Sequence, residues 1–82
     1  MKFMVEFQLR SESKKQVMEM FEQRGPNRNP GVNFRGAWIG STSNVAFVLV
    51  ESADESIVAG VCHQWDQFGT YRIHPVIDVE QY

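Results

Sequence analysis

The stretch VAFVLV, residues 45–50, decides the fold of this 82-residue chain. Alternate residues of a strand point to opposite faces of a sheet. One face of this stretch carries Val45, Phe47 and Leu49, and the other carries Ala46, Val48 and Val50. A strand that is apolar on both faces needs both of them covered, because a solvated face usually carries polar residues. We therefore expect residues 45–50 to form a strand with a covering layer against each face.

Three further stretches have the pattern of strands. KFMVEFQLR, residues 2–10, alternates apolar and polar side chains and has one strongly apolar face. NFRGAWI, residues 33–39, is joined to the stretch NVAFVLVE by GSTSN, a hairpin connection of ordinary length. TYRIHPVIDV, residues 70–79, is the last predicted strand.

Two helices are predicted between these strands. Ser13, followed three residues later by Gln16, fits a capping box, and the helix that it starts ends at Arg24-Gly25-Pro26. Ser52 with Glu55 fits a second capping box, for a helix that ends near Gly69. The apolar stripe of this second helix consists of Ile57, Val58, Val61, Cys62, Trp65 and Phe68.

The resulting order, β-α-β-β-α-β, is that of an α+β ferredoxin-like sandwich. This fold has an antiparallel four-stranded sheet, strand order 4-1-3-2, with both helices on one face. We expect residues 1–82 to form a single domain of this kind, because the chain offers neither a linker nor enough residues for a second core.

Residues 45–50 form a central strand in the order 4-1-3-2, and their second apolar face predicts an assembly. One layer of helices covers one face of the sheet, which leaves an apolar patch of the kind that small monomers rarely expose. A chain of this length also buries only about 60% of its unfolded surface when it folds alone. We therefore expect a homodimer in which two such sheets face each other.

Composition excludes several classes of partner and cofactor. The formal net charge is −2, and the basic residues are scattered over a predicted strand, helix and loop, so nucleic acid is not expected as a partner. No apolar run is long enough for a membrane span, and we expect a cytoplasmic protein. Cys62 is the only cysteine, and no Cys/His cluster has metal-ligand spacing, so neither a metal nor another cofactor is expected.

The two histidines are the obvious candidates for chemistry, but the predicted facing separates them. His63 lies opposite the apolar stripe of its helix and should point to solvent. His74 and Arg72 should face away from the helices, as should Glu6 and Gln8 of the neighbouring first strand. A carboxylate beside an imidazole can orient it for proton transfer, and an arginine can hold an anionic oxygen. The alternative is that these polar groups only hydrogen-bond across an interface or contact solvent.

Two further residues are candidates for ligand contacts. Trp38 either lines a pocket or fills the core, because the facing of residues 33–39 is open; Phe34 and Tyr71 are the other aromatic candidates. Arg28 lies in GPNRNPG, a turn-rich loop that we expect to be mobile and to border a cavity, where Arg28 could contact an anionic ligand. The alternative for Arg28 is a solvated turn.

The stretches MKFMVEF, GPNRNPGV, GAWIGSTSNVAFVLVESAD and HPVIDV resemble a family of small proteins with a domain of unknown function, DUF3303. That family is similar to the dimeric α+β barrel superfamily, in which two ferredoxin-like sheets enclose a cavity. The family often carries a histidine directly after the tryptophan of its second strand. Ile39 occupies this position here, so a role for that histidine does not carry over.

The resemblance implies the fold but leaves the function open. The superfamily includes cofactor-free monooxygenases, lactone isomerases, chlorite-dismutase-like haem proteins and stress-induced proteins, and a fold alone does not choose among them. Haem binding needs an axial ligand in a large apolar pocket, and nothing else in the sequence supports it. Three hypotheses remain: a homodimeric binding module that holds an apolar or aromatic small molecule, a cofactor-free enzyme that uses His74 and Glu6, and a protein-interaction or regulatory module with a packed barrel.

Overall fold

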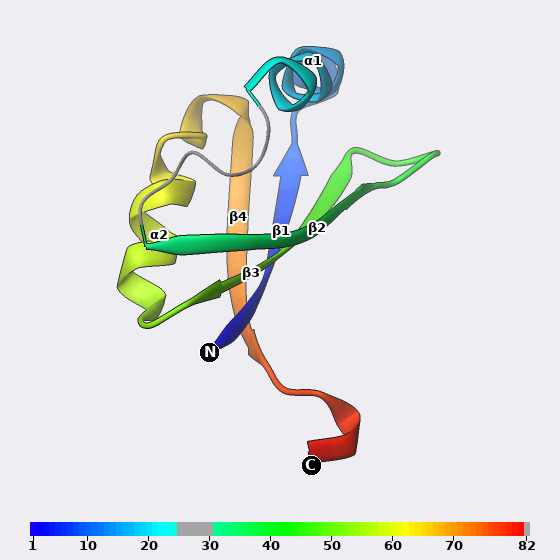
Figure 1. The fold of residues 1–82 in the computed structure, drawn as a ribbon. Coiled ribbons are helices and arrows are strands. Elements are labelled where there is room, and N and C mark those ends of the chain that lie inside the picture. Colours follow the sequence, from blue (N-terminus) through cyan, green and yellow to red (C-terminus); the bar gives the residue numbers. More distant parts are fainter. Residues whose placement is uncertain (25–30, 82) are drawn as a thin grey trace.

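The computed structural model describes residues 1–24 and 31–81 (Figure 1). The strands are β1 (Lys2–Leu9), β2 (Val32–Ile39), β3 (Val45–Ser52) and β4 (Gly69–Val76), and the helices are α1 (Lys14–Arg24) and α2 (Glu55–His63). Short 3-10 turns lie at Ser11–Ser13, Asp66–Phe68 and Val79–Gln81. The predicted order β-α-β-β-α-β is confirmed.

The four strands form one antiparallel sheet in the order β2-β3-β1-β4, which is the predicted order 4-1-3-2. Both β1 and β3 are central strands. In the register, Val5 of β1 lies opposite Val48 of β3 on one side and Ile73 of β4 on the other. β2 and β4 are the edges, and β4 carries Pro75, a residue that sheets accept at an edge.

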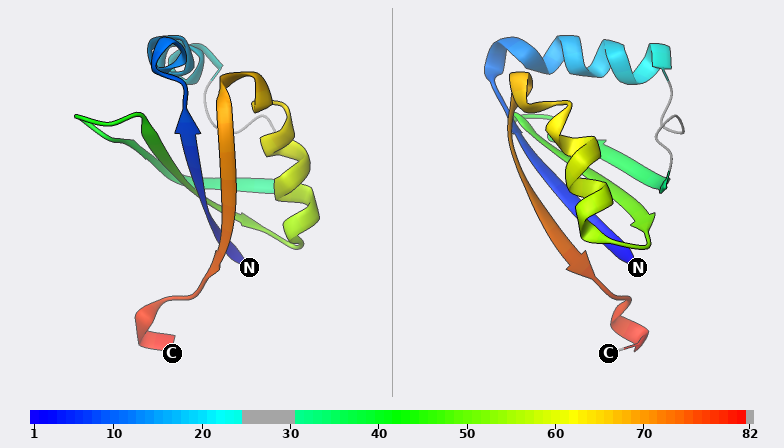
Figure 2. Two further views of the ribbon diagram at one scale, coloured as in Figure 1. Left: turned by 180° about the vertical axis from the view of Figure 1, so that it is seen from behind. Right: turned by 90° about the vertical axis from the view of Figure 1, so that its left-hand side faces the viewer.

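The core lies on one face of this sheet. Alternate residues of β1 and β3 are buried there: Phe3, Val5 and Leu9 with Ala46, Val48 and Val50. α2 packs on this face through Val58 and Cys62, and α1 packs on it through Val17, which clusters with Leu9 and Ala46. Both helices therefore contact the same face, with α2 beside the sheet and α1 across its end (Figure 2).

The start of α1 agrees with the prediction and the start of α2 does not. α1 begins at Lys14, directly after the predicted cap residue Ser13, and a 3-10 turn over Ser11–Ser13 precedes it. The predicted capping box of Ser52 and Glu55 is wrong, because Asp54 caps α2 by accepting a hydrogen bond from the Ser56 backbone N–H at 3.0 Å. Ser52 is instead the last residue of β3, and its hydroxyl donates to the carbonyl oxygen of Gly31 at 2.7 Å.

β4 begins and ends at defined points. Gly69 has φ 158°, and a Cβ there would collide with the carbonyl oxygen of Gln8, so glycine lets β4 begin directly against the end of β1. The predicted strand over residues 70–79 is too long, because β4 ends at Val76 and Val79 belongs to a 3-10 turn.

Lys14, the first residue of α1, ties that helix to the β2–β3 hairpin. Its ammonium group donates to the carbonyl oxygens of Gly40 at 2.9 Å and Ser43 at 2.8 Å. Because the Lys14 ammonium group at the start of α1 binds two carbonyl groups at the tip of the hairpin, the position of the hairpin is coupled to that of α1.

Cys62 is a buried free thiol within the core. Burial raises the pKa of this thiol to about 11, and the nearby negative charge of Asp66 acts in the same direction. A thiol with so high a pKa is almost entirely protonated near neutral pH, which is the state of a structural rather than a reactive cysteine.

In the described part of the chain, no helix is both long and apolar enough to cross a membrane.

Candidate binding face

The sheet face opposite the helices, called the open face here, carries a mixture of apolar and polar side chains. The strand register defines its rows: Met4 lies between Leu49 and His74, and Glu6 lies between Phe47 and Arg72. The central and edge strands β1, β3 and β4 contribute Lys2, Met4, Glu6, Gln8, Val45, Phe47, Leu49, Glu51, Thr70, Arg72, His74 and Val76. The predicted facing of β1 and β4 is confirmed, and β3 turns Ala46, Val48 and Val50 toward the helices.

A bulge in β2 places Trp38 on the open face. Phe34 pairs with Val50 and packs against the core, but the register shifts between Phe34 and Gly36. Beyond this shift Trp38 pairs with Phe47, so it faces away from the helices although simple alternation would put Phe34 and Trp38 on the same side. The indole lies against Gly36, where a Cβ would come within 2.8 Å of the ring. Trp38 therefore lies exposed on the open face and does not fill the core.

The apolar part of the open face is centred on two aromatic side chains. Trp38 is 56% exposed and Phe47 is 39% exposed, which is unusual for aromatic side chains of this size on neighbouring strands. Met4 and Leu49 lie beside them and are half-buried. Sequence reasoning did not predict Phe47, Leu49 and Met4 as ligand contacts. Phe47 and Leu49 could have been found, because the apolar pattern on both faces of residues 45–50 indicates apolar side chains on the uncovered face.

The polar part of the open face lies over β1 and β4. Nε2 of His74 lies 3.2 Å from Oε1 of Glu6, across a diagonal of the sheet. Arg72 is the direct cross-strand neighbour of Glu6, and Gln8 lies opposite Thr70. The side chains of His74 and Glu6 are 49% and 36% exposed, so their attraction is weak while water reaches them. The arrangement can position an imidazole and a guanidinium for an anionic oxygen, with a carboxylate that orients the imidazole.

The other predicted residues lie elsewhere. His63 is on the outer side of α2, where its Nδ1 lies 2.7 Å from Oδ2 of Asp66, so the two histidines do not converge, as predicted. Phe34 and Tyr71 are not on the open face; both pack against the core. Arg28 and the rest of its loop lie outside the described residues. Within residues 1–24 and 31–81, no group of three His, Cys, Asp or Glu side chains could hold a metal ion.

A model of the DUF3303 family, a domain of unknown function, matches residues 1–82. The chain belongs to the DUF3303 family. Neither the curated proteins nor the solved structures include a significant match to it. In this DUF3303 chain, Ile39 pairs with Ala46 and packs against the core cluster near Leu9, so the residue after Trp38 faces the helices rather than the open face. In this DUF3303 chain, the candidate groups for proton transfer and anion binding therefore lie on β1 and β4.

Proposed function

We propose that the protein is a homodimeric binding module in which two open faces meet and enclose a small apolar or aromatic molecule. The observation that carries this proposal is the exposure of Trp38 and Phe47 on the face that the helices leave uncovered. Two facing sheets remove both aromatic side chains from water and close an α+β barrel. A cytoplasmic location is part of the same proposal.

The polar groups of the open face give such a cavity its selectivity. Ligand pockets are mostly apolar, with a few polar groups that fix the orientation of the ligand. Here Trp38 and Phe47 supply flat apolar surfaces, while His74 and Arg72 supply hydrogen-bond donors for an anionic oxygen. An aromatic molecule with one acidic oxygen matches both parts.

Sedimentation equilibrium and native mass spectrometry test the proposal together. We expect a mass of twice the 9.5 kDa chain at micromolar concentration, and native spectra of the purified protein with a small molecule retained by the dimer. The fluorescent probe 8-anilinonaphthalene-1-sulfonate, which is aromatic and anionic, should bind saturably. A stable monomer would overturn the proposal. A dimer that binds neither a copurified molecule nor the probe would support a packed barrel and overturn the binding function.

A second candidate function is cofactor-free proton-transfer catalysis on the bound molecule. The specific observation in its favour is the 3.2 Å contact between His74 Nε2 and Glu6 Oε1. Proton transfer by a positioned histidine contributes about 10²–10⁴-fold to a reaction rate, and a carboxylate partner holds the ring in the useful orientation. Turnover of a copurified molecule in the presence of oxygen or water, lost in His74→Ala, would distinguish the enzyme from a binding module.

Single substitutions at the polar groups are expected to change probe affinity in opposite directions. His74→Ala should weaken the binding of 8-anilinonaphthalene-1-sulfonate about tenfold or more, because a hydrogen bond to a charged group contributes about 1.5–3 kcal/mol. Glu6→Gln should strengthen it, because a carboxylate near the sulfonate is removed while the hydrogen-bonding capacity remains. Fluorescence titration measures both effects.

His63→Ala is the matched control for this pair of variants. It removes the other histidine of the chain, which lies on α2 and is bonded to Asp66, and should leave the probe affinity unchanged. Equal affinities for the wild type, His74→Ala and Glu6→Gln would show that the probe does not contact the polar part of the open face.

A further inference from the structure

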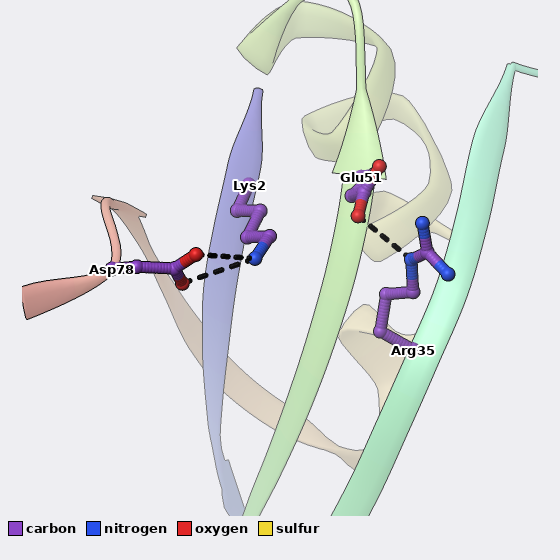
Figure 3. Close-up of polar contacts among 4 residues, drawn as sticks. All are labelled: Lys2, Arg35, Glu51 and Asp78. Atoms are coloured by element: carbon purple, nitrogen blue, oxygen red, sulfur yellow. Dashed lines mark hydrogen bonds and ion pairs between the residues drawn. The ribbon is translucent and has the colours of Figure 1, made fainter. Parts of the chain in front are cut away.

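A row of four charged side chains crosses the sheet at one end of the open face (Figure 3). In spatial order it runs Asp78, Lys2, Glu51, Arg35, from the chain just after β4 to β1, β3 and β2. Lys2 Nζ donates to both carboxylate oxygens of Asp78, at 3.0 and 3.2 Å, and Arg35 Nε donates to Glu51 Oε1 at 2.7 Å. Lys2 and Glu51 are direct cross-strand neighbours. The signs alternate along the row: negative, positive, negative, positive.

The row is ordered within the chain but still accessible from outside. The hydrogen bond from Arg35 lowers the pKa of the Glu51 carboxyl group; burial opposes this, and the charges of Arg35 and Lys2 reinforce it. The outer members remain the most accessible, with side chains 55% exposed for Arg35 and 51% for Asp78. The contact with Glu51 uses Nε of Arg35 (Figure 3), and the guanidinium group carries two further nitrogens that can donate to another acceptor.

An alternating row of four charges is complementary to its own reverse. A two-fold axis that runs parallel to the strands, between β1 and β3, turns the row end for end and keeps it at the same height along the strands. Each charge then faces the opposite sign, since the reversed order reads positive, negative, positive, negative. A two-fold axis along the row itself would place like charges opposite each other. The row therefore selects one of the two ways in which the sheets can face.

The same axis brings the two kinds of sheet edge together. β4 and β2 are the edges of the sheet, so a two-fold axis parallel to the strands sets β4 of one protomer beside β2 of its partner. Edge strands are normally paired or protected, and closure of a barrel pairs them. Asp78 lies at the β4 edge and Arg35 lies on β2, so these two side chains of opposite charge meet at each of the two seams.

We infer that the charged row is a self-recognition surface that pairs Asp78 of one protomer with Arg35 of a second copy of this chain and so fixes the direction of the two-fold axis. This inference rests on the proposed homodimer and specifies its geometry. The partner is a second copy because the pattern of four charges, taken as a unit, is complementary to itself.

Charge reversal at either seam position tests the pairing. Arg35→Glu faces Asp78 of an identical partner, and Asp78→Lys faces Arg35 of an identical partner, so each variant alone should form its homodimer at least tenfold more weakly than the wild type. An equimolar mixture of the two restores opposite charges at both seams. Native mass spectrometry should then show the heterodimer well above the half that random pairing would give.

The mixture separates contacts between protomers from effects within one chain. Each variant also loses or reverses a contact with Glu51 or Lys2 in its own chain, but mixing leaves those contacts unchanged. Glu12→Lys, at an exposed 3-10 turn away from the row, is the matched charge reversal and should leave dimerisation unaltered. A wild-type dimer whose two variants associate normally and mix at random would overturn this inference and leave the homodimer standing. A monomeric wild type would overturn both.

Discussion

Replacing Val48 with aspartate is expected to unfold the protein. Val48 is 8% exposed on the helix-covered face and belongs to the same core cluster as Phe3, Val5 and Val58. A carboxylate in this position has no partner and costs several kcal/mol. Native domains are stable by roughly 0.05–0.15 kcal/mol per residue, so this cost consumes most or all of the stability of so short a chain.

Circular dichroism and urea titration measure this effect. We expect Val48→Asp to lack a cooperative unfolding transition, whereas Val48→Ala, which removes only two methyl groups, should keep one at a lower urea concentration. A folded Val48→Asp with wild-type stability would contradict the assignment of Val48 to the core face.

Replacing the adjacent Phe47 with aspartate is expected to dissociate the proposed homodimer and leave the fold intact. Phe47 is the next residue of β3 but points to the open face, where it lies beside Trp38 and Glu6. The added carboxylate meets water in the monomer but would be buried against the partner in a face-to-face dimer. Desolvation of an unpaired charge costs several kcal/mol, and a two-fold interface contains it twice, so we expect the dissociation constant to rise by more than about a hundredfold.

Sedimentation equilibrium and circular dichroism distinguish the outcomes. The expected result for Phe47→Asp is a species of 9.5 kDa with a wild-type spectrum, and Val48→Asp is its matched control because the same side chain enters the same strand on the opposite face. A Phe47→Asp variant that stays dimeric would show that the open face is not the interface. A Phe47→Asp variant that unfolds would show that the chain needs its partner in order to fold.

The sequence was sufficient for the fold because the decisive strands follow simple alternation. β1 and β3 pair with each other without a register shift, so the residues of each strand could be divided between its two faces from a period of two. The strand order followed from the order of the elements, since β-α-β-β-α-β leaves few arrangements in one sheet. The start of α2 was less well predicted, because Asp54, two residues beyond Ser52, offered an equally good capping side chain.

The candidate site was predictable only where the register was regular. Glu6 and His74 were placed on one face by alternation, but their 3.2 Å contact depends on the pairing of Met4 with His74, which no pattern within one strand contains. β2 could not be assigned because its bulge adds one residue between Phe34 and Trp38 and so reverses the facing of everything after it. Tyr71 followed alternation correctly, and it lies partly buried against the core cluster rather than among the open-face residues.

Lys14 gives the two faces of the sheet a direct mechanical connection. α1 lies on the covered side, yet the carbonyl oxygens that its first residue binds belong to Gly40 and Ser43, at the tip of the hairpin that carries Trp38 and Phe47. A displacement of α1 would therefore reach the hairpin that carries the exposed aromatic pair by two routes, the contacts of Lys14 and the packing of Val17 against Leu9 and Ala46. In this protein the helix layer and the open face are thus linked at the hairpin tip, by one side chain that contacts two main-chain carbonyl groups.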